Sequence, residues 1–153
     1  MRRKDKEITE RSQIEAVIRQ SIICRLGMAD DNIPYIVPLC FGYRDNALYI
    51  HGAPEGKKIE ILKKNQDVCF EFDLNTELVE AESACSWSMK YQSVIGCGKA
   101  SFLEDPEEKR QALEIIMNQY SDKSFRFPEE AINKISVIKI AITSMTGKQS
   151  GFK

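Results

Sequence analysis

The chain has 153 residues, of which 42% are hydrophobic and 29% are charged, and its formal net charge at pH 7 is −1. A chain of this length typically forms one domain that buries roughly 70% of its unfolded surface, so we expect one domain over residues 1–153. The small net charge argues against nucleic acid or an anionic membrane as a partner. No apolar run approaches the ~20 residues of a membrane span, and none follows the basic start as in a signal peptide, so we expect a cytoplasmic protein.

Several familiar kinds of chemistry are missing from the sequence. It holds five cysteines without a CxxC pair and a single histidine, His51, so we expect no metal site. Most of the cysteines lie in apolar segments, where a free thiol behaves as a small hydrophobic group. No GxSxG elbow, GxGxxG fingerprint or complete Walker loop is present. A Cys–His nucleophile pair stays open in principle, but no spacing places a cysteine near His51.

The first part of the chain predicts a helix and then a β-hairpin. Residues Thr9 to Ser21 carry apolar side chains at the spacing of one buried helical face, namely Ile14, Val17 and Ile18. The apolar run from Ile22 to Met28 is typical of a strand, and Asp30 to Asn32 supply the turn that follows. Arg25 interrupts this run. We expect it to face solvent or to pair with a carboxylate, with a buried anion site as the alternative.

The stretch from Pro34 to Lys58 is the most informative part of the sequence. Residues 34–43 alternate in the period-2 pattern of a strand with two distinct faces. The turn at Arg44 to Asn46 contains Asp and Asn, which tolerate the positive φ of a tight hairpin. A second strand over Ala47 to Ala53 contains His51 and leads through Pro54-Glu55-Gly56 into an amphipathic helix.

That helix begins with two lysines, Lys57 and Lys58, where acidic residues are usual. The first turn of a helix exposes N–H groups and carries partial positive charge, so two more cations there are unfavourable unless an anion binds. A phosphate at this helix start would relieve the repulsion. The alternative, that both lysines extend into water, stays open on the residues alone.

The remaining chain adds three strands and two helices. The strands are predicted by alternation over residues 68–74, 91–102 and 137–145. Asp105-Pro106 and Pro128 are typical helix starts. We expect residues 75–84 to form a loop, with a short strand as the alternative, and the end of the chain, TGKQSGFK, to form a polar tail. About six strands joined mostly by hairpins, without βαβ alternation, predict a mainly β fold, a closed antiparallel barrel with peripheral helices.

Four segments of the chain, in this order, resemble one known family. They are PYIVPLCFGYRDNALYIHGAPEGKK (34–58), VCFEFD (68–73), YQSVIGCGKASFL (91–103) and IKIAITSMTGKQSG (138–151). The chain resembles the pyridoxamine-phosphate-oxidase-related flavoproteins, and within them the nitroimidazole-resistance (Nim) branch. The resemblance implies a six-stranded antiparallel Greek-key split barrel that binds FMN, and a homodimer with the flavin at the subunit interface.

The resemblance also implies which residues contact the flavin. The strand matching Val37 to Phe41 would run along the isoalloxazine ring and use backbone groups for its polar edge. The positions near the flavin and its ribityl phosphate would be Ile50, His51, Lys57 and Lys58, and Gln92 and Ser93 would add polar contacts, some of them from the partner subunit. The full set of expected cofactor-binding residues is Val37, Pro38, Leu39, Cys40, Phe41, Ile50, His51, Lys57, Lys58, Gln92 and Ser93.

The function implied is that of an FMN-dependent oxidoreductase. It would pass electrons from NAD(P)H through FMN to a small acceptor, with a nitroaromatic as one candidate, and His51 would be the catalytic residue. The arginine and lysine that pyridoxamine phosphate oxidases carry on the flavin-contacting strand are absent around residues 34–41, which argues against that substrate. The alternatives are a non-catalytic flavin- or haem-binding module, with His51 as the one available imidazole ligand, and a barrel that serves only in protein interaction.

Overall fold

An antiparallel β-sheet of eight strands dominates the structure, a computed structural model that describes residues 3–152. The strands are β1 (Glu7–Ile8), β2 (Cys24–Asp30), β3 (Ile33–Leu39), β4 (Gly42–Arg44), β5 (Ala47–Gly52), β6 (Asp67–Val79), β7 (Ser88–Leu103) and β8 (Ser136–Ser150). Their order is β3-β2-β6-β7-β8-β5-β4, and β1 pairs with β8. The mainly β fold class predicted from the sequence is confirmed.

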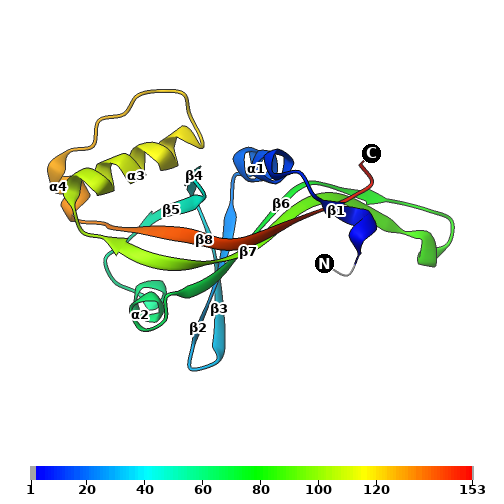
Figure 1. The fold of residues 1–153 in the computed structure, drawn as a ribbon, viewed down its shortest axis with the longest axis horizontal. Coiled ribbons are helices and arrows are strands. Elements are labelled where there is room, and N and C mark those ends of the chain that lie inside the picture. Colours follow the sequence, from blue (N-terminus) through cyan, green and yellow to red (C-terminus); the bar gives the residue numbers. More distant parts are fainter. Residues whose placement is uncertain (1–2, 153) are drawn as a thin grey trace.

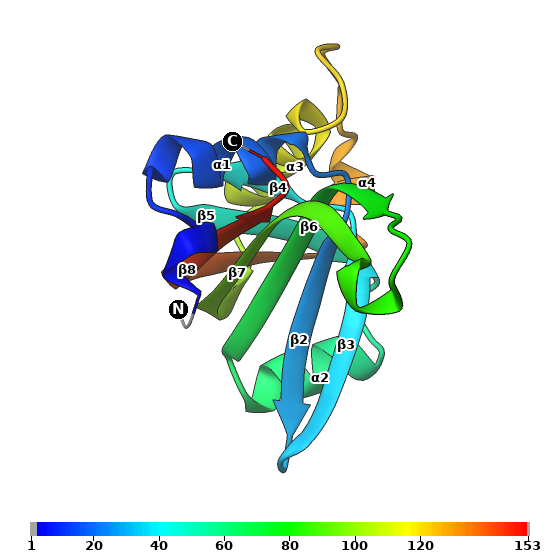
Figure 2. The ribbon, with the colours of Figure 1, turned by 90° about the vertical axis from the view of Figure 1, so that its right-hand side faces the viewer.

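Four helices surround the sheet: α1 (Arg11–Gln20), α2 (Lys57–Lys64), α3 (Pro106–Asn118) and α4 (Glu129–Asn133). Figures 1 and 2 show α1 above and α2 below the curved sheet, with α3 beside β4 and β5. The start of α3 follows the sequence signal, since the Asp105 carboxylate accepts hydrogen bonds from the N–H groups of Glu107 and Glu108 at 3.1 and 2.9 Å. None of the helices in residues 3–152 is long and apolar enough to span a membrane.

The main core lies between the inner face of the sheet and the apolar sides of α1 and α2. Alternation along β6 turns Phe70 and Phe72 inward, and the rings of Phe41 and Phe72 pack with their centroids 4.8 Å apart. A second, smaller cluster joins α3 and α4 to Val137 at the start of β8. Helix α3 is therefore fixed to the outside of the sheet.

Both predicted hairpin turns are confirmed by the backbone. Asp31 and Asn32 have φ of 47° and 66°, and Asp45 and Asn46 have φ of 52° and 58°. Two successive left-handed residues match the right-handed twist of the flanking strands, and Asp and Asn adopt this conformation at low cost. The expectation for Arg25 is confirmed as well, because its guanidinium pairs with the carboxylates of Glu71, at 3.0 Å, and Asp73.

The sheet differs from the closed barrel of about six strands predicted from the residues, both in its number of strands and in its closure. The strand predicted over residues 34–43 is broken at Cys40 and Phe41 into β3 and β4, and the short β1 is an additional strand. The break arises because the Phe41 N–H donates to the Tyr120 hydroxyl of the segment after α3, at 2.9 Å, while the Phe41 ring enters the core. As a result β3 and β4 form the two opposite edges of the sheet. In the described chain no hydrogen-bonded strand pairing joins these edges into a closed barrel.

Two strands extend further than the sequence predicted, one into the expected loop at residues 75–84, where a short strand was the alternative, and one into the expected polar tail. Strand β6 continues to Val79, and the polar tail forms the end of β8, where Lys148 and Gln149 pair with Ser93 and Gln92 of β7. Ladder hydrogen bonds hold these residues although they lack apolar alternation. Gly147 is needed there, because an added Cβ would lie 2.8 Å from Ile14 and 2.9 Å from Ile8.

Candidate functional site

A groove of about 360 Å³ separates β3 from the start of α2. One wall is β3, with Val37, Pro38 and Leu39, and the other is the turn that leads into α2, with Lys57 and Lys58. We call this feature the β3–α2 groove. Five residues that the family resemblance assigns to the cofactor thus come together in one place, although they lie about 20 positions apart in the chain.

The helix start in the groove has no side-chain cap. Gly56 occupies the N-cap position with φ of 115°, and no side chain accepts a hydrogen bond from the first turn of α2. This φ is costly for a residue with a Cβ, so glycine is required here. The first N–H groups of α2 therefore remain available to an anion in the groove.

The two lysines add positive charge to the same point. Among residues 3–152, neither Lys57 nor Lys58 forms an ion pair, although Glu55 also lines the groove. The Lys58 side chain is half-buried, and this burial lowers the pKa of its ammonium group. It folds back over β5, where a Cβ added to Gly52 would lie 2.9 Å from Lys58 Nζ. A half-buried cation that lacks a carboxylate partner is stabilised when an anion binds next to it, so Lys58 is the clearest indication of an anionic ligand.

His51 lies next to this cation but faces a different cavity. Its neighbour Ile50 points into the core, so His51 points outward and lines an apolar cavity of about 240 Å³ beneath α3 and α4, with Ile116 and Ile132. Burial lowers the pKa of His51 from its ordinary value of 6.5, and the positive charge of Lys58 lowers it further. The imidazole is consequently neutral at pH 7, and Lys58 is the link between the groove and His51.

The other predicted site residues lie outside the groove. The side chains of Phe41 and Ile50 are fully buried in the core, so neither side chain can contact a ligand in the groove. Cys40 is exposed in the connection between β3 and β4. Gln92 and Ser93 lie on β7, where Gln92 accepts a hydrogen bond from the Asn75 amide at 2.9 Å. A single chain does not bring these β7 residues to the groove.

Sequence reasoning missed two residues that shape the site. Tyr35 lines the groove beside Val37, and the period-2 pattern of β3 could have identified it because both fall on the same face. Gly52 leaves the space that the Lys58 side chain occupies. No sequence signal indicated that role, since it depends on how α2 packs against β5.

Comparison with known proteins places the chain in a family. Residues 10–149 match the family model for pyridoxamine 5'-phosphate oxidase. The chain belongs to this family. A comparison with curated proteins found no match.

Solved structures agree with this assignment. A candidate 5-nitroimidazole antibiotic resistance protein from Bacteroides thetaiotaomicron is 42% identical, with a TM-score of 0.85 over 94% of this chain and 86% of that chain. A flavocytochrome from Azotobacter vinelandii shares 20% identity and a TM-score of 0.86, over 99% of this chain and 72% of that chain. An FAD- and haem-binding protein from Mycobacterium smegmatis shares 18% identity and a TM-score of 0.87, over 96% and 74%. The family resemblance read from the sequence is thereby confirmed, and the two distant structures show the same fold.

The link between Lys58 and His51 can be tested by NMR titration. Replacing Lys58 with Met removes the positive charge but keeps an unbranched side chain, so the pKa of His51 should rise toward its ordinary value. Lys57→Met is the matched control and should leave the His51 pKa unchanged. Because the chain has one histidine, the Cε1–H resonance of its ring reports the titration without overlap from other histidines. Equal His51 pKa values in the wild type and Lys58→Met would show that the ammonium does not act on the imidazole.

Proposed function

We propose that the protein binds FMN and that the β3–α2 groove holds its phosphate. The observation that carries this proposal is the half-buried, unpaired Lys58 beside Lys57 at an uncapped helix start. A phosphate there would accept hydrogen bonds from backbone N–H groups and from both ammonium groups, and it would neutralise the two cations. The family and the flavin-binding proteins of the same fold support FMN as the source of that phosphate.

The rest of the groove suits a flavin ring. Strand β3 is an edge strand of the sheet. In the described chain, the backbone N–H and C=O groups on its outer edge do not pair with another strand. Val37 and Leu39 offer apolar surface next to these groups, and Pro38 is exposed between them. Ring nitrogens and carbonyl groups could thus bond to the strand edge while the ring face contacts apolar side chains, which would fix the ring's orientation.

The reaction we propose is electron transfer from NAD(P)H to a small acceptor. Bound FMN supplies the redox chemistry by accepting hydride and passing electrons on. The chain would hold the phosphate with Lys57 and Lys58 and orient the ring along β3. His51 lies beyond Lys58 and faces the cavity beneath α3 and α4, so in this proposal the acceptor would extend past Lys58 toward that cavity, where the neutral imidazole would donate or accept a hydrogen bond. The likeness to the candidate 5-nitroimidazole resistance protein supports a nitroaromatic acceptor.

We also propose that a second copy of the chain covers the outer face of the sheet. The register places Ile36, Gly27, Cys69 and Cys97 side by side across β3, β2, β6 and β7, and Ile36 is 65% exposed. Ile95, on the same outer face, is 56% exposed. The exposed apolar row borders a mostly apolar hollow of about 560 Å³. A patch of this kind usually marks a protein interface. In such a dimer Ser93, which shares the outer face with Ile95, would reach the partner's flavin, whereas the Gln92 side chain lies on the opposite face of β7.

The absorption spectrum tests flavin binding and turnover on one sample. Purified protein mixed with FMN and then desalted should retain the two flavin bands. NADPH or NADH should bleach these bands, and a nitroimidazole should restore them in the absence of oxygen. The physical reason is that the groove provides the phosphate contacts for FMN while the solvent-exposed edge of β3 leaves the ring accessible.

Other spectra would contradict parts of this proposal. A protein that stays colourless after incubation with FMN does not bind flavin and overturns the whole proposal. A Soret band that forms with added haem, without flavin uptake, supports the haem-binding alternative with His51 as the ligand. Flavin bands that neither NADPH nor NADH bleaches would leave a flavin-binding module without the proposed reaction.

The dimer can be tested by placing a charge in the apolar row. Ile36→Glu would bury a carboxylate in the proposed interface, so the dissociation constant of the dimer should rise at least about tenfold, which corresponds to ~1.4 kcal/mol. Phe125→Glu, in the exposed segment between α3 and α4, is the control and should leave the dimer intact. Light scattering during gel filtration measures the mass. A wild-type protein that elutes as a monomer refutes the dimer.

A further inference from the structure

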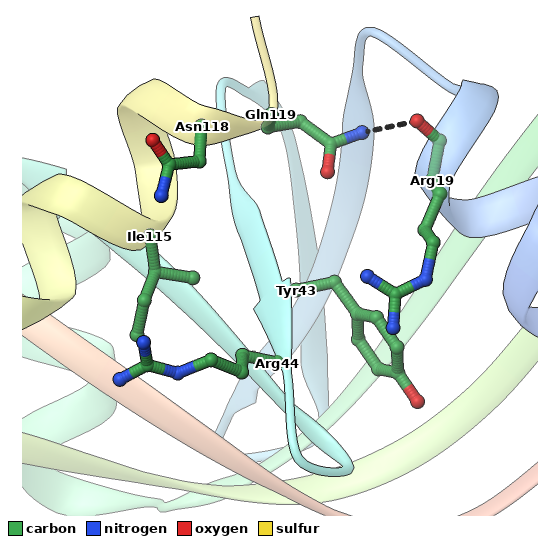
Figure 3. A pocket seen from close by; sticks show the side chains of 6 residues that line it. All are labelled: Arg19, Tyr43, Arg44, Ile115, Asn118 and Gln119. Atoms are coloured by element: carbon green, nitrogen blue, oxygen red, sulfur yellow. Dashed lines mark hydrogen bonds between the residues drawn. The ribbon is translucent and has the colours of Figure 1, made fainter. Parts of the chain in front are cut away.

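A second hollow, of about 270 Å³, lies on the far side of the sheet from α2. Figure 3 shows that the end of α1, the strand β4 and the end of α3 enclose it. We call it the α1–β4–α3 hollow. Its lining residues are Arg19, Tyr43, Arg44, Ile115, Asn118 and Gln119.

Two arginines line this hollow, and each forms only a long ion pair with a neighbouring carboxylate. Within residues 3–152 neither the Arg19 nor the Arg44 guanidinium donates a hydrogen bond, and the nearest carboxylate oxygens, from Glu15 and Asp45, are each 3.8 Å away. Arg11 on the same helix shows the contrast, since it binds Glu15 at 3.0 Å and the Asn46 side chain at 2.7 Å. The ion pairs of Arg19 and Arg44 are both too long for hydrogen bonds, so each guanidinium keeps its five N–H donors, in a planar fork that matches carboxylate and phosphate oxygens.

The Arg19 side chain is directed by the aromatic ring of Tyr43. The guanidinium lies 5.2 Å from the centre of this ring, as expected for a cation–π contact. The ring is itself fixed, because the Tyr43 hydroxyl accepts from Arg11 at 3.3 Å and donates to Glu15 at 3.0 Å. Tyr43 is only 5% exposed. Arg19 is thus held along the wall of the hollow, and Figure 3 shows Arg44 on the facing side, below Asn118.

The opposite wall, α3, is held rigidly against both neighbours. The Gln119 amide nitrogen lies 3.2, 2.9 and 2.9 Å from three backbone carbonyl oxygens at the end of α1, those of Ile18, Arg19 and Ser21, so its two N–H groups donate to these carbonyls with one N–H shared. These bonds satisfy carbonyls that a helix end leaves free. On the other side α3 packs directly on Gly42 of β4, where an added Cβ would lie 2.6 Å from the Ile115 backbone. The hollow is therefore preformed, which lowers the entropic cost of binding.

We propose that the α1–β4–α3 hollow is a binding site for a small organic dianion, either a phosphate monoester or a dicarboxylate. The two guanidinium groups would each bind one charged end or share one phosphate, and the Asn118 amide would donate to a neutral oxygen of the ligand. Ile115 would contact a short apolar body. The volume lies just below the 300–1,000 Å³ of pockets for drug-sized ligands, so the ligand is small. The site is separate from the β3–α2 groove.

An NMR titration of the full chain tests this site. FMN is present throughout at saturation, so that any phosphate site at Lys57 and Lys58 is filled. Glycerol 2-phosphate and succinate are added in separate arms, and the side-chain amide signals of Asn118 and Gln119 are followed. At least one dianion should shift these signals with a saturable curve, and the arm that does so identifies the ligand class. Absence of a saturable shift in both arms overturns the proposal.

Variants assign the binding to the arginines. The pair Arg19→Gln and Arg44→Gln should weaken binding at least tenfold, because both charged ends lose their partner. The pair Arg126→Gln and Lys134→Gln removes the same charge from exposed positions elsewhere and should leave the affinity unchanged. Arg19→Lys with Arg44→Lys keeps the charge but loses the fork, so its affinity should be intermediate. Equal weakening by the control pair would mean general electrostatic attraction and would also overturn the proposal.

Discussion

The proposed cofactor site depends on one half-buried ammonium group, that of Lys58. Lys58 lies in the first turn of α2, where the helix already carries partial positive charge. It packs over Gly52, it has no carboxylate partner among residues 3–152, and its charge lowers the pKa of His51. Burying a cation this way costs free energy unless an anion arrives. The packing of α2 against β5 thus has two effects: it favours the binding of an anionic ligand at Lys58, and it keeps the nearby His51 imidazole neutral. The proposed FMN phosphate would be that anion, and the proposed reaction would use the neutral imidazole.

The unclosed sheet explains how one fold offers several surfaces. Because the chain leaves the sheet at Cys40 and Phe41, β3 and β4 become opposite edges with separate environments. The free edge of β3 faces α2 and forms the groove. The strand β4 packs under α3 and forms a wall of the arginine-lined hollow. The outer face of β2, β3 and β6 remains apolar and exposed. A break of two residues therefore separates the proposed cofactor site from the proposed dianion site.

Local signals in the sequence predicted most helices and strands, whereas features that depend on tertiary contacts could not be predicted from the sequence. The hairpin turns at Asp31 and Asp45 and the start of α3 follow from local backbone chemistry. The break at Phe41 could not be read because it requires the Tyr120 hydroxyl, 79 residues away. The polar end of β8 lacks alternation and is ordered by its partners on β7. In the site, two adjacent lysines at a helix start were a strong signal, but their separation from Gln92 and Ser93 depends on the topology of the sheet.

The comparison of FMN with riboflavin tests the central claim most directly, because the two differ only in the phosphate. If Lys57 and Lys58 hold the phosphate through two charge-assisted contacts, FMN should bind on the order of 100-fold more tightly than riboflavin to the wild type. In the variant with Lys57→Ala and Lys58→Ala, this preference should largely disappear while riboflavin affinity changes little. Quenching of flavin fluorescence gives all four affinities. A wild type that binds both flavins equally, or a variant that keeps the full preference for FMN, would contradict the account.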